Sequence, residues 1–426
     1  MGNRAWLLLA LIAACGDVKG ETVDARRIDT PPMIDTPMID TPLPVTPTAV
    51  SVSGISTFAV AASTFTKVQY ATELYDDNNE YDTTTNRFTP KAAGDYLICA
   101  SLTGPNGFEL DLFLNETRHG GFAFSSTSVV EGCRAIRLAV GDYVDVRVYS
   151  PSMTYTTNAD YDYLTIYPVT LATYVKTSAA FSVASTTFTT IPYDTELIDA
   201  LGAWDTTTKQ FTAPSAGDYI FCGSIHQSGP STNAEVDLYV DGVRTKSFTY
   251  NYEATTGCRT LRLAANAVVS VQMYQFTSGT ISVPQDTDWN WLQVLQVPAT
   301  FSVESMSQLV LPNVTNVLVP YTGEAFDEQA QFDVGTHQFT AASAGDYLFC
   351  GSINFQTTTA PGHLMLFKNG TKLRGLGHGP AAITGCNVLR LAAGDQISVD
   401  AYQASGNQLT LNADTLWFWL QASKLK

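Results

Sequence analysis

The feature that most constrains this chain is a stretch of sequence that occurs three times. Each occurrence has an aromatic residue before Asp, then a Phe-Thr pair, then a Gly-Asp-Tyr motif that leads to a Cys. The Phe of the Phe-Thr pair is Phe88, Phe211 and Phe339 in turn, at spacings of 123 and 128 residues. Residues 50–426 therefore divide into three copies of about 125 residues, each the size of an ordinary domain.

Two further blocks recur in every copy. A Gly-Cys pair opens the first block, at Gly132, Gly257 and Gly385. The second block holds two aromatic residues one position apart, namely Tyr161/Tyr163, Trp289/Trp291 and Trp417/Trp419. From these blocks we predict domains at residues 50–170, 177–297 and 298–426.

Each copy has the residue pattern of an all-β domain. Val144, Val146 and Val148 alternate with other residues after a Gly-Asp turn, which is the two-residue period of a strand. Thr, Val, Tyr and Phe are abundant, and Gly, Asn and Asp interrupt them at short intervals. No window has a sustained helical period. The pattern predicts a two-sheet sandwich of the jelly-roll type.

The order and spacing of these motifs resemble the globular head domain of complement C1q and its bacterial relatives. The resemblance also rests on Asp241-Gly242, Asn369-Gly370 and a later Leu-x-Leu-x-x-Gly-Asp-x-Val pattern. Copy 2 departs from it at Asn266-Ala267 and copy 1 at Asn115-Glu116, both of which fall in turns.

Domains of the C1q and tumour-necrosis-factor type usually assemble as trimers. The resemblance therefore implies three tandem C1q/TNF-like jelly rolls packed as an intramolecular pseudo-trimer in a monomeric chain. Beads on a string, or assembly between chains, are the alternatives. We expect the recurring Arg137, Arg262 and Arg390 to line the contacts between copies or to be exposed. Packing in the core or between copies is the favoured role of the paired aromatics, over sugar stacking.

Each copy carries one pair of Cys residues. In the topology of this family the two strands that carry them are neighbours, so the resemblance implies three disulfides: Cys99–Cys133, Cys222–Cys258 and Cys350–Cys386. Buried free thiols are the alternative. A zinc site is disfavoured because no CxxC spacing and no recurring His accompanies the pairs.

The amino terminus predicts export. Residues 1–15 have a short apolar stretch after Arg4, too short to span a bilayer, and Ile12-Ala13-Ala14-Cys15 resembles a bacterial lipobox. We therefore expect a lipoprotein signal peptide with Cys15 as the lipidation site, and an ordinary signal peptide is the alternative. Gly16 rather than Asp follows Cys15, which favours the outer membrane or the cell surface in a diderm source.

Residues 16–49 form a linker rich in Pro, Asp and Thr, with the sequence Ile-Asp-Thr-Pro three times. Proline fixes φ and removes a backbone donor, so neither a regular helix nor a continuous strand ladder is expected. Extension at about 3.1 Å per residue gives a stalk of up to roughly 100 Å. We interpret it as a spacer between membrane and domains.

Composition excludes some classes of function. A net charge of −17 argues against nucleic acid as a partner, and 45% apolar residues exclude a disordered chain. The five His occupy no position shared by all copies, so we expect lone surface His, no catalytic triad and no enzyme. Calcium is the one candidate cofactor, with Asp76, Asp77, Glu80 and Asp82 as ligands; a solvated acidic loop is the favoured alternative.

These expectations lead to one preferred function and two alternatives. The preferred function is a lipid-anchored surface protein that presents its heads for binding or adhesion to a protein or glycan ligand. The first alternative is a structural envelope or coat component without a specific ligand. The second is a jelly-roll carbohydrate enzyme, which needs a carboxylate pair around a cleft. No ligand-binding residue is assigned by the sequence.

Overall fold

The computed structural model describes residues 46–104, 107–125, 128–227, 234–251, 254–286, 288–355, 362–379 and 382–425. All of them belong to one compact unit, Val45–Lys426. Cys15, the predicted signal peptide and the predicted linker up to residue 45 lie outside the described residues. Within the described ranges the chain forms strands and turns, and no helix there is long and apolar enough to cross a membrane.

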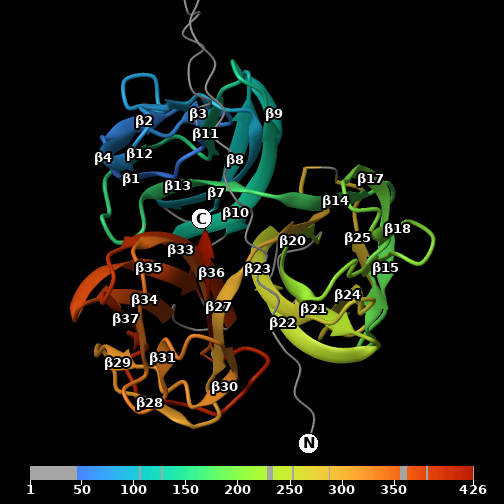
Figure 1. Cartoon of the computed structure of the whole chain (residues 1–426). Coiled ribbons are helices and arrows are strands. Elements are labelled where there is room, and N and C mark those ends of the chain that lie inside the picture. Colours follow the sequence, from blue (N-terminus) through green and yellow to red (C-terminus); the bar gives the residue numbers. More distant parts are fainter. Residues whose placement is uncertain are drawn as a thin grey trace, which may run out of the picture. The chain divides into compact units, whose positions relative to one another are not determined.

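Copy 1 is a sandwich of two antiparallel sheets, drawn in blue to teal in Figure 1. The inner sheet has the strand order β10 (Val129–Leu138), β7 (Gly94–Thr103), β13 (Tyr163–Val169), β1 (Val50–Ile55), β4 (Tyr70–Asp76). The outer sheet has the order β9 (Thr117–Ser125), β8 (Phe108–Leu114), β11 (Val144–Tyr149), β6 (Arg87–Phe88), β5 (Tyr81–Asp82), and β3 (Thr66–Lys67) also pairs with β11. A separate ribbon joins β2 (Phe58–Val60) to β12 (Met153–Tyr155).

Copy 2 repeats this topology. Its inner sheet has the order β17 (Tyr193–Asp199), β14 (Leu171–Thr177), β26 (Trp291–Gln296), β20 (Gly217–His226), β23 (Ala254–Leu263). β23 also pairs with β9 of copy 1, where Ala254 lies opposite Phe124, so this sheet is continuous with the outer sheet of copy 1. Its outer sheet has the order β18 (Trp204–Asp205), β19 (Gln210–Thr212), β24 (Val268–Gln275), β21 (Ala234–Val240), β22 (Val243–Asn251), with β16 (Thr189–Thr190) on β24. The ribbon pairs β15 (Phe181–Val183) with β25 (Ile281–Val283). β14 supplies the first strand of copy 2 and begins before residue 177.

Copy 3 follows the same plan. Its inner sheet has the order β30 (Gly323–Asp327), β27 (Ala299–Glu304), β39 (Trp419–Leu425), β33 (Gly345–Asn354), β36 (Ala382–Leu391). Its outer sheet has the order β31 (Phe332–Asp333), β32 (Gln338–Thr340), β37 (Gln396–Gln403), β34 (Gly362–Lys368), β35 (Thr371–Gly379), with β29 (Val317–Leu318) on β37. The ribbon pairs β28 (Leu309–Leu311) with β38 (Leu409–Leu411). The predicted fold of three tandem all-β jelly rolls is confirmed.

The inner sheets are covered on both faces. Along β7, Tyr96 and Ile98 pack in the core of copy 1, whereas Leu97 and Cys99 belong to a second cluster with residues of all three copies. Alternate residues of a strand point to opposite faces, so a strand buried on both faces needs a nearly continuous apolar sequence. The run from Tyr96 to Leu102 has this property, and its residues are all buried.

Candidate functional site

The three predicted disulfides are present: Cys99–Cys133, Cys222–Cys258 and Cys350–Cys386. Each joins residues that face each other on neighbouring strands of an inner sheet. The Sγ atoms of Cys133, Cys258 and Cys386 lie within 4.8 Å of one another, although they come from three different copies. Because thiolate sulfur is the metal ligand and these sulfurs are in disulfides, the cluster is a packing contact rather than a metal site.

Two of the three interfaces between copies share a glutamine contact, which we call the glutamine clamp. Gln293 of copy 2 accepts a hydrogen bond from Ala135 N of copy 1 and donates one to Ala135 O, both at 2.7 Å. Gln421 of copy 3 makes the same two bonds to Thr260 of copy 2, both at 2.9 Å. The matching residue of copy 1 is Thr165, which bonds only within its own copy, at 3.5 Å to Cys99 O. The copy 1–copy 3 interface therefore lacks the clamp.

Each interface also pairs a guanidinium with one of the recurring aromatics. Arg134 lies 4.7 Å from the ring of Trp291, and Arg259 lies 3.8 Å from that of Trp419. At the copy 1–copy 3 interface the ring is Tyr163 and the guanidinium, at 5.6 Å, is Arg374 of the adjacent strand β35. The paired aromatics thus pack between copies, as predicted. The third interface differs again, because its arginine comes from another strand.

The acidic residues predicted as calcium ligands have structural contacts in this loop. Asp76 accepts a hydrogen bond from Tyr81 N at 2.7 Å, and Asp199 and Asp327 do the same for residues 204 and 332 of the other copies, at 3.1 and 2.6 Å. Asp82 accepts from Thr84 N at 2.7 Å, and these turn bonds hold the pKa of its carboxyl below the usual range. Repetition of the same bonds in all copies indicates that both positions fix loops.

Asp77 and Glu80 are also engaged. Asp77 pairs with Arg390 of copy 3 at 2.9 Å, and Glu80 accepts a hydrogen bond from Lys91 N at 2.7 Å. Burial raises the pKa of the Glu80 carboxyl. Arg262 makes the corresponding pair with Glu328 across the copy 2–copy 3 interface at 2.7 Å. Calcium at these residues stays a prediction.

The prediction of lone surface histidines is wrong for three of the five. His363 and His378 face each other in the β34–β35 hairpin, and their ring centroids are 4.5 Å apart. Burial lowers the pKa of His363 to about 4 and that of His378 to about 3. His119 is half-buried, and burial lowers its pKa to about 3. Which residue lies opposite another across a hairpin depends on register, which the sequence pattern left open.

A position on the rim of each interface differs between the copies, and we call it the rim position. In copy 1 it holds Phe65, whose ring centroid lies 5.2 Å from that of Phe113 and 4.9 Å from that of Tyr149. In copy 2 it holds Phe188, 5.5 Å from Tyr239 and 4.7 Å from Tyr274. A guanidinium covers each of these phenylalanines, from Arg118 at 5.2 Å and from Arg244 at 5.0 Å.

Carboxylates lie beside the two phenylalanine rims. Arg118 pairs with Asp111 at 2.8 Å and with Asp288 of copy 2 at 3.0 Å, and Arg244 pairs with Glu235 at 2.7 Å. Burial raises the pKa of Glu109 and of Glu235 to about 7. The arginine guanidinium pairs with the carboxylates at each of these rims, and the phenylalanine ring fills the space beside them. The carboxylates therefore have a structural role.

In copy 3 the rim position is Asn316, and a cavity of about 230 Å³ lies there. It opens between copies 1 and 3, and its lining residues are Asn158, Asp160, Tyr161, Asn316, His363, Met365, Lys372 and Tyr402. His363 and Met365 stand where copy 1 has Glu109 and Asp111. The substitution of a small amide for a phenylalanine ring accounts for the open space.

Hydrogen bonds fix the wall of this cavity. The Tyr161 hydroxyl lies 2.6 Å from His363 Nδ1 and 3.2 Å from Met365 Sδ. Lys372 Nζ pairs with Asp160 Oδ2 at 2.6 Å across the interface. The ring of Tyr402 packs 5.3 Å from that of His363. Tyr161, one of the paired aromatics, was expected to pack rather than to stack on a sugar, and the other lining residues were not predicted. The change from Phe to Asn at the rim position is a second signal in the sequence.

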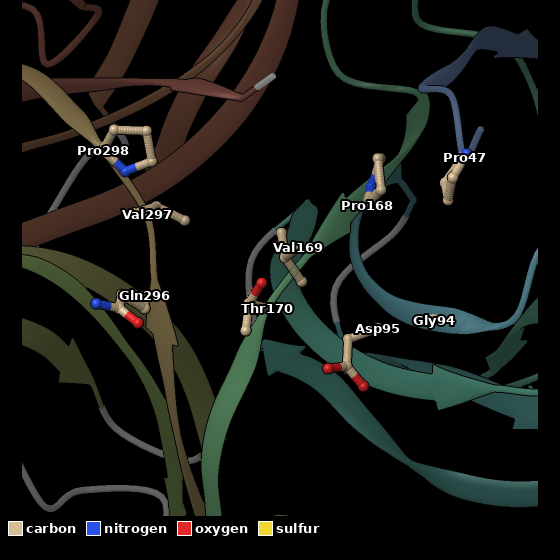
Figure 2. Close-up of a pocket in the computed structure, with 9 residues that line it drawn as sticks. All are labelled: Pro47, Gly94, Asp95, Pro168, Val169, Thr170, Gln296, Val297 and Pro298. Carbon is tan, nitrogen blue, oxygen red and sulfur yellow. The ribbon is translucent and has the colours of Figure 1, made fainter. Parts of the chain in front are cut away.

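A second cavity, of about 140 Å³, lies where the chain passes from one copy to the next. Figure 2 shows its lining, which is formed by the links at Pro168, Val169 and Thr170 and at Gln296, Val297 and Pro298, together with Pro47, Gly94 and Asp95. Asp95 Oδ2 accepts a hydrogen bond from Leu171 N at 3.0 Å, and the same carboxylate pairs with Arg137 at 2.7 Å. Its one charged group is thus used to hold the link.

Comparisons with known proteins give only distant likenesses. No protein-family model and no curated protein matches the chain. A triple jelly-roll protein of an archaeal virus turret is similar at 10% identity over 88% of this chain and 91% of that one, with a TM-score of 0.19. A tandem CBM22 domain from Paenibacillus barcinonensis Xyn10C is similar at 7% identity over 61% and 97%, with a TM-score of 0.20.

Proposed function

We propose that the chain is a lipid-anchored surface protein whose C1q-like heads bind a protein or glycan ligand. The observation that carries the proposal is the difference between the three rims. Two are filled by phenylalanine, and the third is open, polar and lined by two copies. Pockets of this kind, with a few polar groups converging from rigid elements, are where proteins most often hold small ligands.

The amino-terminal sequence supports the anchored location. A lipid on Cys15 and the Pro-rich linker would hold the heads away from an outer membrane or cell surface. Mass spectrometry of the mature amino terminus tests this part: we expect Cys15 to be the first residue and to carry acyl chains. A mature chain that begins elsewhere without lipid contradicts it.

Binding is tested with the purified mature chain on a glycan array and in pull-down from a surface extract. We expect saturable binding that is reduced when the open rim is altered. A structural coat component is the alternative. The buried contacts that connect the three copies favour it, because a firmly packed assembly also suits a purely mechanical role. Binding to nothing in either assay would favour that alternative.

The proposal is of a binding protein rather than an enzyme. The carboxylates beside the filled rims are paired with Arg118 and Arg244, which leaves them poorly placed for acid–base work. Turnover of polysaccharides by the purified chain would contradict this part.

Calcium binding is tested by measuring the melting temperature in calcium and in chelator. An equal melting temperature would exclude Asp76, Asp77, Glu80 and Asp82 as calcium ligands.

A further inference from the structure

We propose that the cavity between copies 1 and 3 binds one hexopyranose ring, such as the terminal sugar of a glycan. The inference rests on the proposed function and names the ligand class and the place.

The cavity of copy 3 lies at the position where copies 1 and 2 hold a phenylalanine ring. In copies 1 and 2 a phenylalanine ring lies between two aromatic side chains and under a guanidinium. Copy 3 keeps the neighbours at the same strand positions, as Phe367, Tyr402 and the cation Lys372. Of these neighbours Tyr402 and Lys372 line the cavity, a lysine replaces the arginine of the other copies, and Asn316 replaces the filling ring. A six-membered ring from outside the chain would restore the packing that the other two copies have.

The size fits one ring. At about 230 Å³ the cavity is much larger than the roughly 30 Å³ that one water occupies in the liquid. It is below the range of about 300 to 1,000 Å³ that is typical of sites for larger ligands. A single sugar ring is therefore a better match than an extended oligosaccharide, and the rest of a glycan would extend into solvent.

The polar groups suit a neutral ligand with several hydroxyls. Asn158 and Asp160 come from copy 1, and Asn316 and Lys372 from copy 3, so both copies contribute hydrogen-bonding groups to the lining. A hydroxyl both donates and accepts, and it can use amide, carboxylate and ammonium groups alike. Lys372 is already paired with Asp160 at 2.6 Å, which leaves no uncompensated cation to hold a phosphate or a carboxylate.

The apolar face of a sugar ring would find the ring of Tyr402. Tyr402 packs 5.3 Å from the ring of His363, and this wall is held in place because the Tyr161 hydroxyl contacts both His363 Nδ1 and Met365 Sδ. Preorganised walls lower the entropic cost of binding. His and Met side chains are also ligands for soft metals, but here both atoms are engaged by the same hydroxyl. A soft metal ion is therefore an outcome to be tested rather than our proposal.

The test uses calorimetry and ligand-observed NMR on the full mature chain with glucose, galactose, mannose and N-acetylglucosamine. We expect at least one of them to bind with one ring per chain. Asn316→Phe inserts the side chain that copies 1 and 2 have at this position, so it should fold normally and weaken sugar binding at least tenfold. Thr315→Phe adds the same ring at the neighbouring exposed position and should leave binding unchanged.

A second variant protects the test against a folding defect. Asn158→Asp keeps the oxygen that accepts a hydrogen bond from Asp160 N at 3.1 Å and removes only the amide donor of this lining residue, so it should fold normally and weaken binding severalfold. The inference is overturned if none of the four sugars binds, if Asn316→Phe binds as tightly as the natural chain, or if Cu(I) binds at His363 in place of sugar. Binding of the natural chain and Asn316→Phe to the same array ligand would overturn the inference and leave the proposed function standing.

Discussion

The interfaces of copy 1 with copy 2 and of copy 2 with copy 3 resemble each other, and the interface of copy 3 with copy 1 does not. The first two have a glutamine clamp and a phenylalanine at the rim. The third has Thr165 in place of the glutamine and Asn316 in place of the phenylalanine. The third interface therefore forms without the glutamine clamp and without the phenylalanine, and the missing ring leaves room for a ligand.

The clamp provides the largest expected contrast. Gln293→Leu keeps the volume of the side chain and leaves Ala135 N and O buried without partners, so we expect a loss of about 2–4 kcal/mol in the free energy of unfolding. Thr165→Val at the third interface removes only one long hydrogen bond and should cost less than about 1 kcal/mol. Urea unfolding of both variants measures the contrast, and equal losses would contradict it.

The two similar interfaces differ in the hydrogen bonds that their buried arginines make. Arg134 donates hydrogen bonds to Asp288 O at 3.0 Å and to the Tyr174 hydroxyl. The guanidinium nitrogens of Arg259 donate no hydrogen bond to residues in the described ranges. Its Nη2 lies 3.6 Å from Glu304 Oε1 of copy 3, and burial lowers the pKa of Arg259. We therefore expect Arg134→Met to cost about 2 kcal/mol and Arg259→Met to be neutral or to stabilise by about 1 kcal/mol. Thermal melting tests the order, and a larger loss from Arg259→Met would reverse it.

The third interface should also respond to pH through Glu131. This carboxyl accepts a hydrogen bond from His378 N at 3.2 Å, and burial raises its pKa to about 8. Because the folded state holds this proton more tightly than the unfolded state, its contribution to stability grows as the pH falls through 8 and shrinks as the pH rises. Below pH 6.5 the buried His363 and His378, whose pKa values are lowered, act in the opposite direction.

Glu131→Gln should remove about 1–2 kcal/mol of the stability gained between pH 8.5 and pH 6.5. The variant should also be more stable than the natural chain at pH 8.5, where the natural chain must bury a carboxylate. Exposed Glu73→Gln is the control and should leave the pH dependence as it is. Melting curves at both pH values give the result, and an unchanged pH slope in Glu131→Gln argues against a raised pKa.

The ion pairs across the interfaces should matter least. Glu328 is 71% exposed where it meets Arg262, and Asp77 is 53% exposed where it meets Arg390. Exposed pairs contribute between 0 and about 1 kcal/mol, and salt screens them. Glu328→Ala and Asp77→Ala should therefore each cost less than about 0.5 kcal/mol in 0.15 M salt. A loss above 1 kcal/mol in either would show that these pairs hold the copies together.

The repeated motifs predicted the fold and the disulfides well, because both depend on features that recur along the chain. Alternation identified strands such as β11, and the matched Cys positions identified facing strand pairs. The candidate site was out of reach for a related reason. It depends on where copies differ, on which residue faces His363 across a hairpin, and on how Tyr161 of copy 1 meets Met365 of copy 3. Those are long-range contacts, and sequence spacing carries no information about them.

The acidic loop is the opposite case. Asp76 and Asp82 drew attention because carboxylates close together in sequence suit a metal, yet both hold backbone N–H groups of their own turns. The equivalent Asp199, Asp205 and Asp333 do the same in the other copies. Repetition of these bonds across the copies favours a structural role for both positions, and calcium at this loop stays a prediction.

Asn316 illustrates a consequence of carrying the three copies in one chain. In a trimer of identical chains one codon change alters all three rims at once, so a change that suits a ligand must also be tolerated at every interface. Here each rim is encoded separately, and one can diverge while the other two keep their phenylalanines. If the open rim binds the sugar ring that we propose, such a particle would hold one ligand per three heads, and changes at that single site would leave the other two rims unaltered.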